Sequence, residues 1–143
     1  MNPTAKSSLD ELSASICWAL LRQVGLGRIA MNGPTGEIEV FPVNFVVDHG
    51  SVVFTTGAGT KLSLALDGGR ATFEADSVDR GTAWSVVAKG PMNVVHLHEE
   101  LIESFELNVR SWHAGSKPSY VRLVPDIITG RRFEYDTADT LIG

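Results

Sequence analysis

The chain has little of what marks several large protein classes. Its 143 residues contain one cysteine, Cys17, so no internal disulfide can form. No apolar run is long enough to span a membrane, and the first residues lack the charged-then-apolar order of a leader peptide. These absences predict a cytoplasmic protein that does not enter a membrane.

Basic residues are also scarce. The 12 Lys and Arg residues stand against 17 Asp and Glu residues, which gives a net charge of −5, and no basic run exceeds Arg131–Arg132. A nucleic-acid backbone would be repelled by such a surface, so we expect no nucleic acid as partner. An apolar content of 43% at this length is typical of one globular domain, here residues 1–143. The expected partner is a small molecule or another protein.

The hydrophobic pattern changes once, near Gly25. Before it, Ser8 and Glu11 form a capping box, and apolar residues at helical spacing predict an N-terminal helix over about 8–24. After it, alternating segments between turn residues predict a barrel over about 26–135. We expect strands at 26–31, 37–48, 51–56, 70–76, 83–97, 120–124 and 132–135, and helices at 60–66 and 99–112.

Short strands with turns every eight to twelve residues indicate a mainly β fold with capping helices. The first three strands follow one another closely, so they are expected to be antiparallel neighbours. The fold class predicted is a small, closed or partly closed antiparallel β-barrel. Such a barrel is too narrow to enclose a large ligand, so a sizeable ligand would lie on its outer wall, where a second subunit could cover it.

Two glycine-rich segments differ in their context. Residues 25–30 match a dinucleotide-binding fingerprint in letters, but a helix precedes them and a strand follows, which is the reverse of what that motif needs. Residues 57–61 follow a strand and open a helix, so backbone N–H groups and the side chains of Thr56, Thr60 and Lys61 could meet a phosphate. A plain glycine turn with a solvated lysine explains this segment equally well.

Proline interrupts the otherwise apolar strand 37–48. Pro42 cannot donate to a ladder, so the strand must lie at an edge or a bulge there, and Asn44 beside it could meet the polar rim of a flat ring. No nucleophile elbow and no acid/base carboxylate pair stands out, so no catalytic side chain is predicted. His96 and His98 alternate on one strand, but no further ligands complete a metal site, so none is predicted.

Taken together, five segments resemble the pyridoxamine 5′-phosphate oxidase-like family, whose members are FMN-binding split barrels. The similarity spans roughly residues 9–135, and its segments are FPVNF (41–45), VVFTTGAGTKL (52–62), ATFEAD (71–76), AWSVVAKGPMNVV (83–95) and YVRLVPDIITGRRF (120–133). The resemblance implies an antiparallel split β-barrel and a homodimer with the flavin in the cleft between two barrels.

The resemblance also implies cofactor-binding residues. Four groups follow in chain order: Pro42, Val43 and Asn44 line the flavin ring; Thr55 and Thr56 contact the ribityl and phosphate portion; Thr60 and Lys61 grip the phosphate; Trp84 and Ser85 make polar contacts to the ring. The redox step then belongs to the flavin, and the protein supplies orientation and hydrogen bonds.

Two departures from the family pattern shape the expected function. The Arg-x-His and Trp-Gln segments of true pyridoxamine phosphate oxidases are replaced here by Thr129–Phe133, which argues against that substrate. Thr60 stands where those oxidases have a second basic residue, so a deazaflavin such as F420 is the alternative cofactor to FMN. We therefore expect a flavin-dependent oxidoreductase; the alternatives are an F420-dependent reductase and a flavin- or haem-binding module without turnover.

Overall fold

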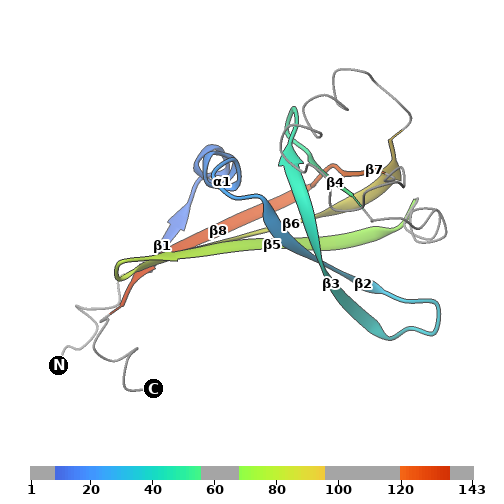
Figure 1. The fold of residues 1–143 in the computed structure, drawn as a ribbon, viewed down its shortest axis with the longest axis horizontal. Helices are drawn as coiled ribbons and strands as arrows, with labels where there is room; N and C mark the ends of the chain where they lie inside the picture. The colour runs from blue at the N-terminus through green and yellow to red at the C-terminus, as the bar shows by residue number, and fades with distance from the viewer. Residues whose placement is uncertain (1–8, 56–67, 96–119, 136–143) are drawn as a thin grey trace, which may run out of the picture.

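The structure, a computed structural model, describes residues 9–55, 68–95 and 120–135 (Figure 1). Eight strands and one helix make up this part of the chain. In order, they are β1 (Leu9–Leu12), α1 (Ala14–Leu21), β2 (Leu26–Asn32), β3 (Ile38–Val47), β4 (Val52–Thr55), β5 (Arg70–Asp79), β6 (Thr82–Val94), β7 (Tyr120–Leu123) and β8 (Ile127–Glu134).

Six of these strands close into an antiparallel barrel. Their order is β6-β5-β2-β3-β4-β7, and pairing between β7 and β6 completes the ring, while β8 and then β1 extend the sheet beside β6. The chain neighbours β2, β3 and β4 pair antiparallel, as their short connections predict. The predicted antiparallel split β-barrel is confirmed.

The long strand β6 is where the barrel splits. One edge of β6 pairs with β8 from Thr82 to Lys89 and with β7 from Met92 to Val94. The change falls at Gly90–Pro91. A β-carbon at Gly90 would collide with the carbonyl oxygen of Val124, so only glycine lets the loop before β8 pass this closely.

Alternation along the strands gives the sheet two unlike faces. The inner face carries the core, which includes Ile29, Phe45, Phe73 and Val86, and α1 packs on this side (Figure 1). We call the opposite face of β2, β3, β5, β6 and β8 the outer wall. Within the described residues, no element covers the outer wall.

The N-terminal helix is shorter than predicted. Residues 9–12 form β1, which pairs with residues 130–133 of β8, so Glu11 is in a strand and the predicted capping box is wrong. The helix begins at Ala14, where the Ser13 side chain accepts a hydrogen bond from the Ile16 N–H at 3.3 Å. The spacing of apolar residues predicts a helix from residue 8 because it carries no information about a partner strand about 120 residues further along the chain.

The last strand begins earlier than predicted. Strand β8 starts at Ile127 rather than at Arg132, so Gly130, expected in the preceding loop, is inside a strand. A β-carbon at Gly130 would lie 2.5 Å from Cys17 Sγ, so glycine at this position lets α1 dock on the sheet. The predicted helices 60–66 and 99–112 fall outside the described residues. None of the helical structure described is long and apolar enough to cross a bilayer.

Candidate functional site

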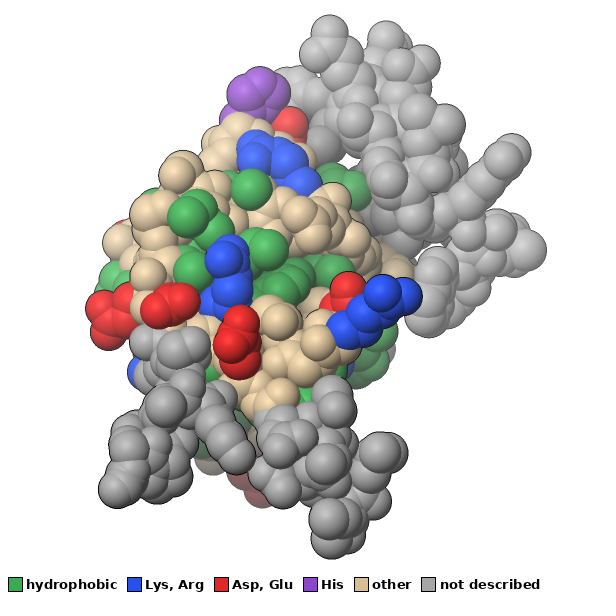
Figure 2. All heavy atoms as spheres, turned by 90° about the vertical axis from the view of Figure 1, so that its left-hand side faces the viewer, with side chains coloured by type: hydrophobic (Ala, Val, Ile, Leu, Met, Phe, Trp, Pro, Cys, Tyr) green, Lys and Arg blue, Asp and Glu red, His purple; other side chains and the backbone are tan. Residues whose placement is uncertain are grey.

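The outer wall exposes large apolar side chains in a way that the rest of the described surface does not. Ile38, Val40 and Val78 are 76%, 65% and 63% exposed. Eight large hydrophobic residues of the described chain are exposed, and six lie on this wall: Leu26, Ile38, Val40, Val78, Ile127 and Phe133. Figure 2 shows hydrophobic side chains at the surface among basic and acidic ones. A face that carries most of the exposed apolar side chains is typical of a binding surface.

Three of the residues that the resemblance implies project from this face, and a fourth, Thr55, projects to the same side from the neighbouring strand β4. Alternation places Pro42 and Asn44 of β3 on the outer wall, together with Ser85 of β6. Thr55 shares a face of β4 with Val53, which packs against Val46 on the outer side of β3. Asn44 and Thr55 directly precede and follow the paired residues Phe45 and Phe54, so they are neighbours across the two strands.

The edge of β3 is open beside these residues. From Ile38 to Asn44, β3 pairs with β2 on one side, and none of the described strands pairs with its other side. Pro42, which has no N–H, lies in this stretch, so the predicted edge position is confirmed. Backbone groups along the open edge are therefore available to a ligand beside Asn44 and Thr55.

Two predicted residues face the other way. The Val43 side chain is only 4% exposed and belongs to the core, so a ligand on the outer wall would meet the backbone of Val43 alone. Trp84 packs against the same core, on the face opposite to Ser85. Thr56, Thr60 and Lys61 lie outside the described residues, so the structure does not place the predicted phosphate site.

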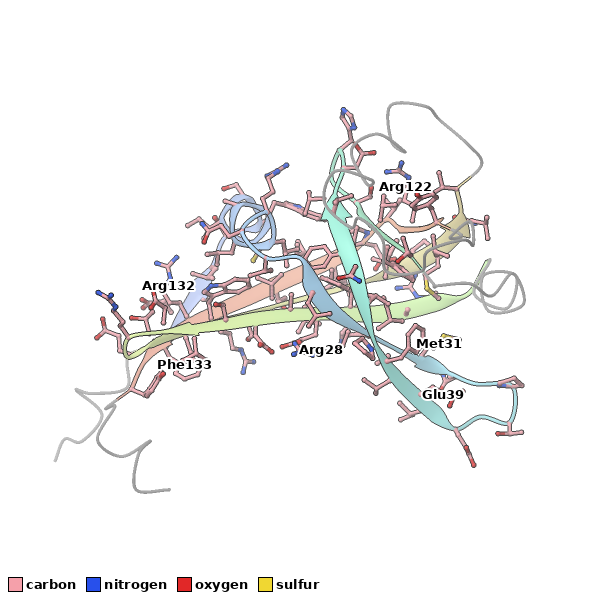
Figure 3. The ribbon with its side chains drawn as sticks, in the orientation of Figure 1. Arg28, Met31, Glu39, Arg122, Arg132 and Phe133 are labelled. Atoms are coloured by element: carbon pink, nitrogen blue, oxygen red, sulfur yellow. The ribbon has the colours of Figure 1, made fainter. Side chains whose placement is uncertain are left out.

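A charge cluster lies on the outer wall next to Pro42. Arg28 of β2 is the cross-strand partner of Pro42 on one side and of Glu74 on the other. Its guanidinium Nη1 donates to Glu74 Oε1 at 3.0 Å and to Asp76 Oδ2 at 3.2 Å. Arg28 and Phe133 both project away from α1, whereas Arg132 lies on the α1 side of β8 (Figure 3).

Partial burial beside a second carboxylate changes the protonation of Glu74. Burial raises the pKa of Glu74 to about 7, and its hydrogen bond with Asp76 acts in the same direction, while Arg28 opposes the shift. The Glu74 side chain is 30% exposed, so it can exchange a proton with solvent. A carboxyl that titrates near neutral pH can hold or release a proton at this face.

The sequence analysis missed this cluster. Glu74 and Asp76 stand two residues apart in the predicted strand 70–76, a spacing that places both on one face. That signal was present, but the partner Arg28 is 46 residues away and only the pairing of β2 with β5 brings it near. Within the described residues, no group of three or more His, Cys, Asp or Glu side chains converges as a metal site would require.

Comparisons with known proteins agree with the fold and with its family resemblance. A family model described as pyridoxamine 5′-phosphate oxidase matches residues 13–132. The FAD binding protein from Mycobacterium smegmatis is 39% identical in its solved structure, with a TM-score of 0.74 over 89% of this chain and 100% of that one.

Two further relatives extend the comparison. A conserved protein of unknown function from Corynebacterium diphtheriae is 31% identical, with a TM-score of 0.70 over 87% of this chain and 98% of that chain. An uncharacterized protein of Mycobacterium tuberculosis is 32% identical over 90 residues, which are 63% of this chain and 82% of that protein.

Proposed function

Because this chain belongs to the pyridoxamine 5′-phosphate oxidase family, we propose that it is a flavin-dependent oxidoreductase that binds its flavin on the outer wall, as a homodimer. The observation that carries the proposal is the open edge of β3, with Asn44 and Thr55 side by side next to it. The relative from M. smegmatis, at 39% identity, is an FAD binding protein, which supports a flavin here.

The apolar side chains of the outer wall support the proposed homodimer. Six exposed hydrophobic side chains on one face are costly in water, and burial stabilises by roughly 25 cal/mol per Å² of apolar surface. A second copy related by a two-fold axis would present the same face, so the contact is self-complementary. Two copies would then cover the site and keep water from it.

The residues of this chain have separate parts in the proposed site. The Asn44 amide can donate to the polar edge of the flavin ring and orient it, and Thr55 and Ser85 can donate from the two sides of the wall. Thr56, Thr60 and Lys61 would hold the phosphate. When bound, the flavin supplies the transfer of hydride or electrons, and no side chain is required as a nucleophile.

Pyridoxamine 5′-phosphate itself is not the proposed substrate. The segment Thr129–Phe133 replaces the basic and aromatic segments that mark true members of that activity, and in the structure it is the second half of β8. Gly130 in this segment packs under Cys17, which is a structural role. FMN is the proposed flavin, FAD is supported by the relative, and F420 remains the alternative because of Thr60.

The test is a titration of purified protein with FMN, FAD and F420, followed by visible absorbance. We expect FMN to bind. Lys61→Ala should weaken it by about tenfold or more, since a hydrogen bond to a charged group contributes about 1.5–3 kcal/mol, and Asn44→Ala by about two- to tenfold, since a neutral hydrogen bond contributes about 0.5–1.5 kcal/mol. Gln23→Ala removes an exposed amide next to α1, on the other face, and should leave affinity unchanged. Equal affinity of Asn44→Ala and Gln23→Ala would reject the proposed site.

A further inference from the structure

A cleft opens at the base of the β2–β3 hairpin, separate from Asn44 and Thr55. Strand β2 pairs with β5 only from Arg28 to Ala30, although β2 and β3 continue as a pair to Asn32 and Ile38. Beyond Ala30 the hairpin therefore leaves the sheet. The space between hairpin and sheet measures about 290 Å³ and is lined by Ala30, Met31, Asn32, Ile38, Arg70, Ala71, Thr72 and Lys89.

The lining combines an apolar floor with hydrogen-bond donors on one side. Ala30 and Ile38 offer flat apolar contact, and Asn32, Thr72 and Lys89 offer an amide, a hydroxyl and an ammonium group. Thr72 is the cross-strand partner of both Ala30 and Lys89, so these three residues form a row across β2, β5 and β6. A ring with a phosphate attached matches this division into apolar and donor surfaces.

Lys89 is the charge in the cleft that is left for a ligand. Arg70 is held by Asp126, with Nη1 to Oδ2 at 2.8 Å and Nη2 to Oδ1 at 3.0 Å. The Asp126 N–H in turn donates to the Lys89 carbonyl at 2.9 Å, which fixes the loop beside the cleft. Among the ion pairs of residues 9–55, 68–95 and 120–135, none uses the Lys89 ammonium group.

The carboxylates on the same face are already bound to arginines. Glu74 and Asp76 are both bound to Arg28, and Asp126 is bound to Arg70. The space is at the small end of ligand pockets, which measure roughly 300–1,000 Å³, so it fits a mononucleotide and not a whole dinucleotide.

We propose that the hairpin cleft binds one phosphate-bearing nucleotide unit, with Lys89 and Thr72 on the phosphate and the ring against Ala30 and Ile38. This inference goes beyond the proposed flavin site, which uses Asn44 and Thr55; Ile38 lies at the far end of the same edge of β3, so the cleft borders the proposed dimer contact. Two ligands carry the required chemistry: FAD, through its adenylate half, and a reduced nicotinamide nucleotide that donates electrons.

The test uses ADP as the probe, measured by calorimetry with the full chain. We expect Lys89→Gln to weaken ADP binding by about tenfold or more and to leave FMN binding within about twofold. Arg22→Gln removes one exposed positive charge at the end of α1, on the other face of the sheet, so ADP binding should stay within about twofold of the wild type. Amide shifts of the wild-type protein on ADP addition should concentrate at Asn32, Thr72 and Lys89, which tests the cleft without any substitution.

The outcomes separate this inference from the flavin proposal. If ADP competes with FAD but not with FMN, the cleft holds the adenylate half of FAD; if ADP competes with NADH or NADPH, it holds the electron donor. Either result supports the proposal. Unchanged ADP affinity in Lys89→Gln, or no ADP binding by a protein that still binds FMN, would overturn it while leaving the flavin site intact.

Discussion

The two faces of the same sheet differ in what their side chains do. On the inner face, Phe73 is fully buried and meets Phe45 edge-on with ring centroids 4.7 Å apart, and α1 closes over Gly130. On the outer wall, Val78 of the same strand as Phe73 is 63% exposed. Alternation along each strand thus separates a face that holds the fold together from one that is free to bind.

The largest expected effect comes from the inner face. Phe73→Ala should lower the free energy of unfolding by about 3–5 kcal/mol, because it leaves a cavity beside Phe45. Val78→Ala, in the same strand but on the outer wall, should change the free energy of unfolding of the monomer by less than about 0.5 kcal/mol. Urea denaturation at low protein concentration measures both. Similar losses in the two variants would show that the faces are not distinct.

The second prediction concerns a substitution that changes only the outer wall. Val40→Arg should raise the dissociation constant of the proposed homodimer by about a hundredfold or more, since it would put a charge into the proposed apolar contact. Monomer stability should change little, because Val40 is exposed in the single chain. Sedimentation over a range of concentrations measures the change.

A matched variant controls for the added charge. Ile16 is an exposed apolar residue of α1, away from the wall, so Ile16→Arg should leave the oligomeric state unchanged. A wild-type protein that sediments as a monomer at all concentrations contradicts the proposed dimer, and equal behaviour of the two arginine variants contradicts the position of its interface.

The third prediction concerns pH and the Arg28–Glu74–Asp76 cluster. The pKa of Glu74 is raised from its ordinary value of 4.5 to about 7, so folding favours the protonated carboxyl. The stabilisation from this group is complete below pH 4.5 and is lost as pH rises toward 7. After allowance for solvent screening, we expect a loss of about 1 kcal/mol over that range.

Glu74→Gln cannot titrate and should lack this component of the pH dependence. Urea denaturation of both proteins between these two pH values measures the difference. Repeating the series in the Val40→Arg background keeps the wall exposed, so it separates the titration of the single chain from that of the dimer. Parallel pH profiles for wild type and Glu74→Gln would contradict the assignment.

The smallest expected effect concerns the polar contacts between β7 and the turn before β4. Arg122 of β7 donates to Asp48 Oδ2 at 2.9 Å and also bonds Ser51 Oγ in the turn before β4. Burial works against ionisation of Asp48, but bonds from Arg122 and His49 keep its pKa below the ordinary value. Arg122→Gln should cost about 0.5–1 kcal/mol near neutral pH, and the cost should disappear as the solution is acidified and Asp48 is protonated. Thermal or urea unfolding at the two pH values tests this.

The sequence predicted most of the barrel because its strands alternate and its turns are local. β2, β3 and β4 lie within two residues of their expected bounds. The prediction failed at the N-terminus, where Leu9–Leu12 pair with the distant β8 instead of starting a helix. Pairing with a distant strand leaves no signal in the local sequence, so the capping-box pattern led to the prediction of a helix there.

The candidate site was predictable in part for the same reason. Proline in a strand pointed to the open edge at Pro42, and this needs no knowledge of other strands. The family resemblance identified candidate residues but did not show on which face of the sheet each side chain lies. It therefore grouped Val43 with Asn44 and Trp84 with Ser85, although the two side chains of each pair project to opposite faces. The Arg28 cluster and the Lys89 cleft depend on pairings across β2, β5 and β6, which only the fold supplies.

Sedimentation with detection of both protein and flavin absorbance tests the central claim most directly. With FMN or FAD added to saturation, we expect the flavin signal to move with a boundary at twice the mass of one chain. In Val40→Arg, the flavin signal should leave the protein boundary as the dimer dissociates. A flavin that travels with the single chain, or that never travels with the protein, would contradict a site built on the outer wall between two copies.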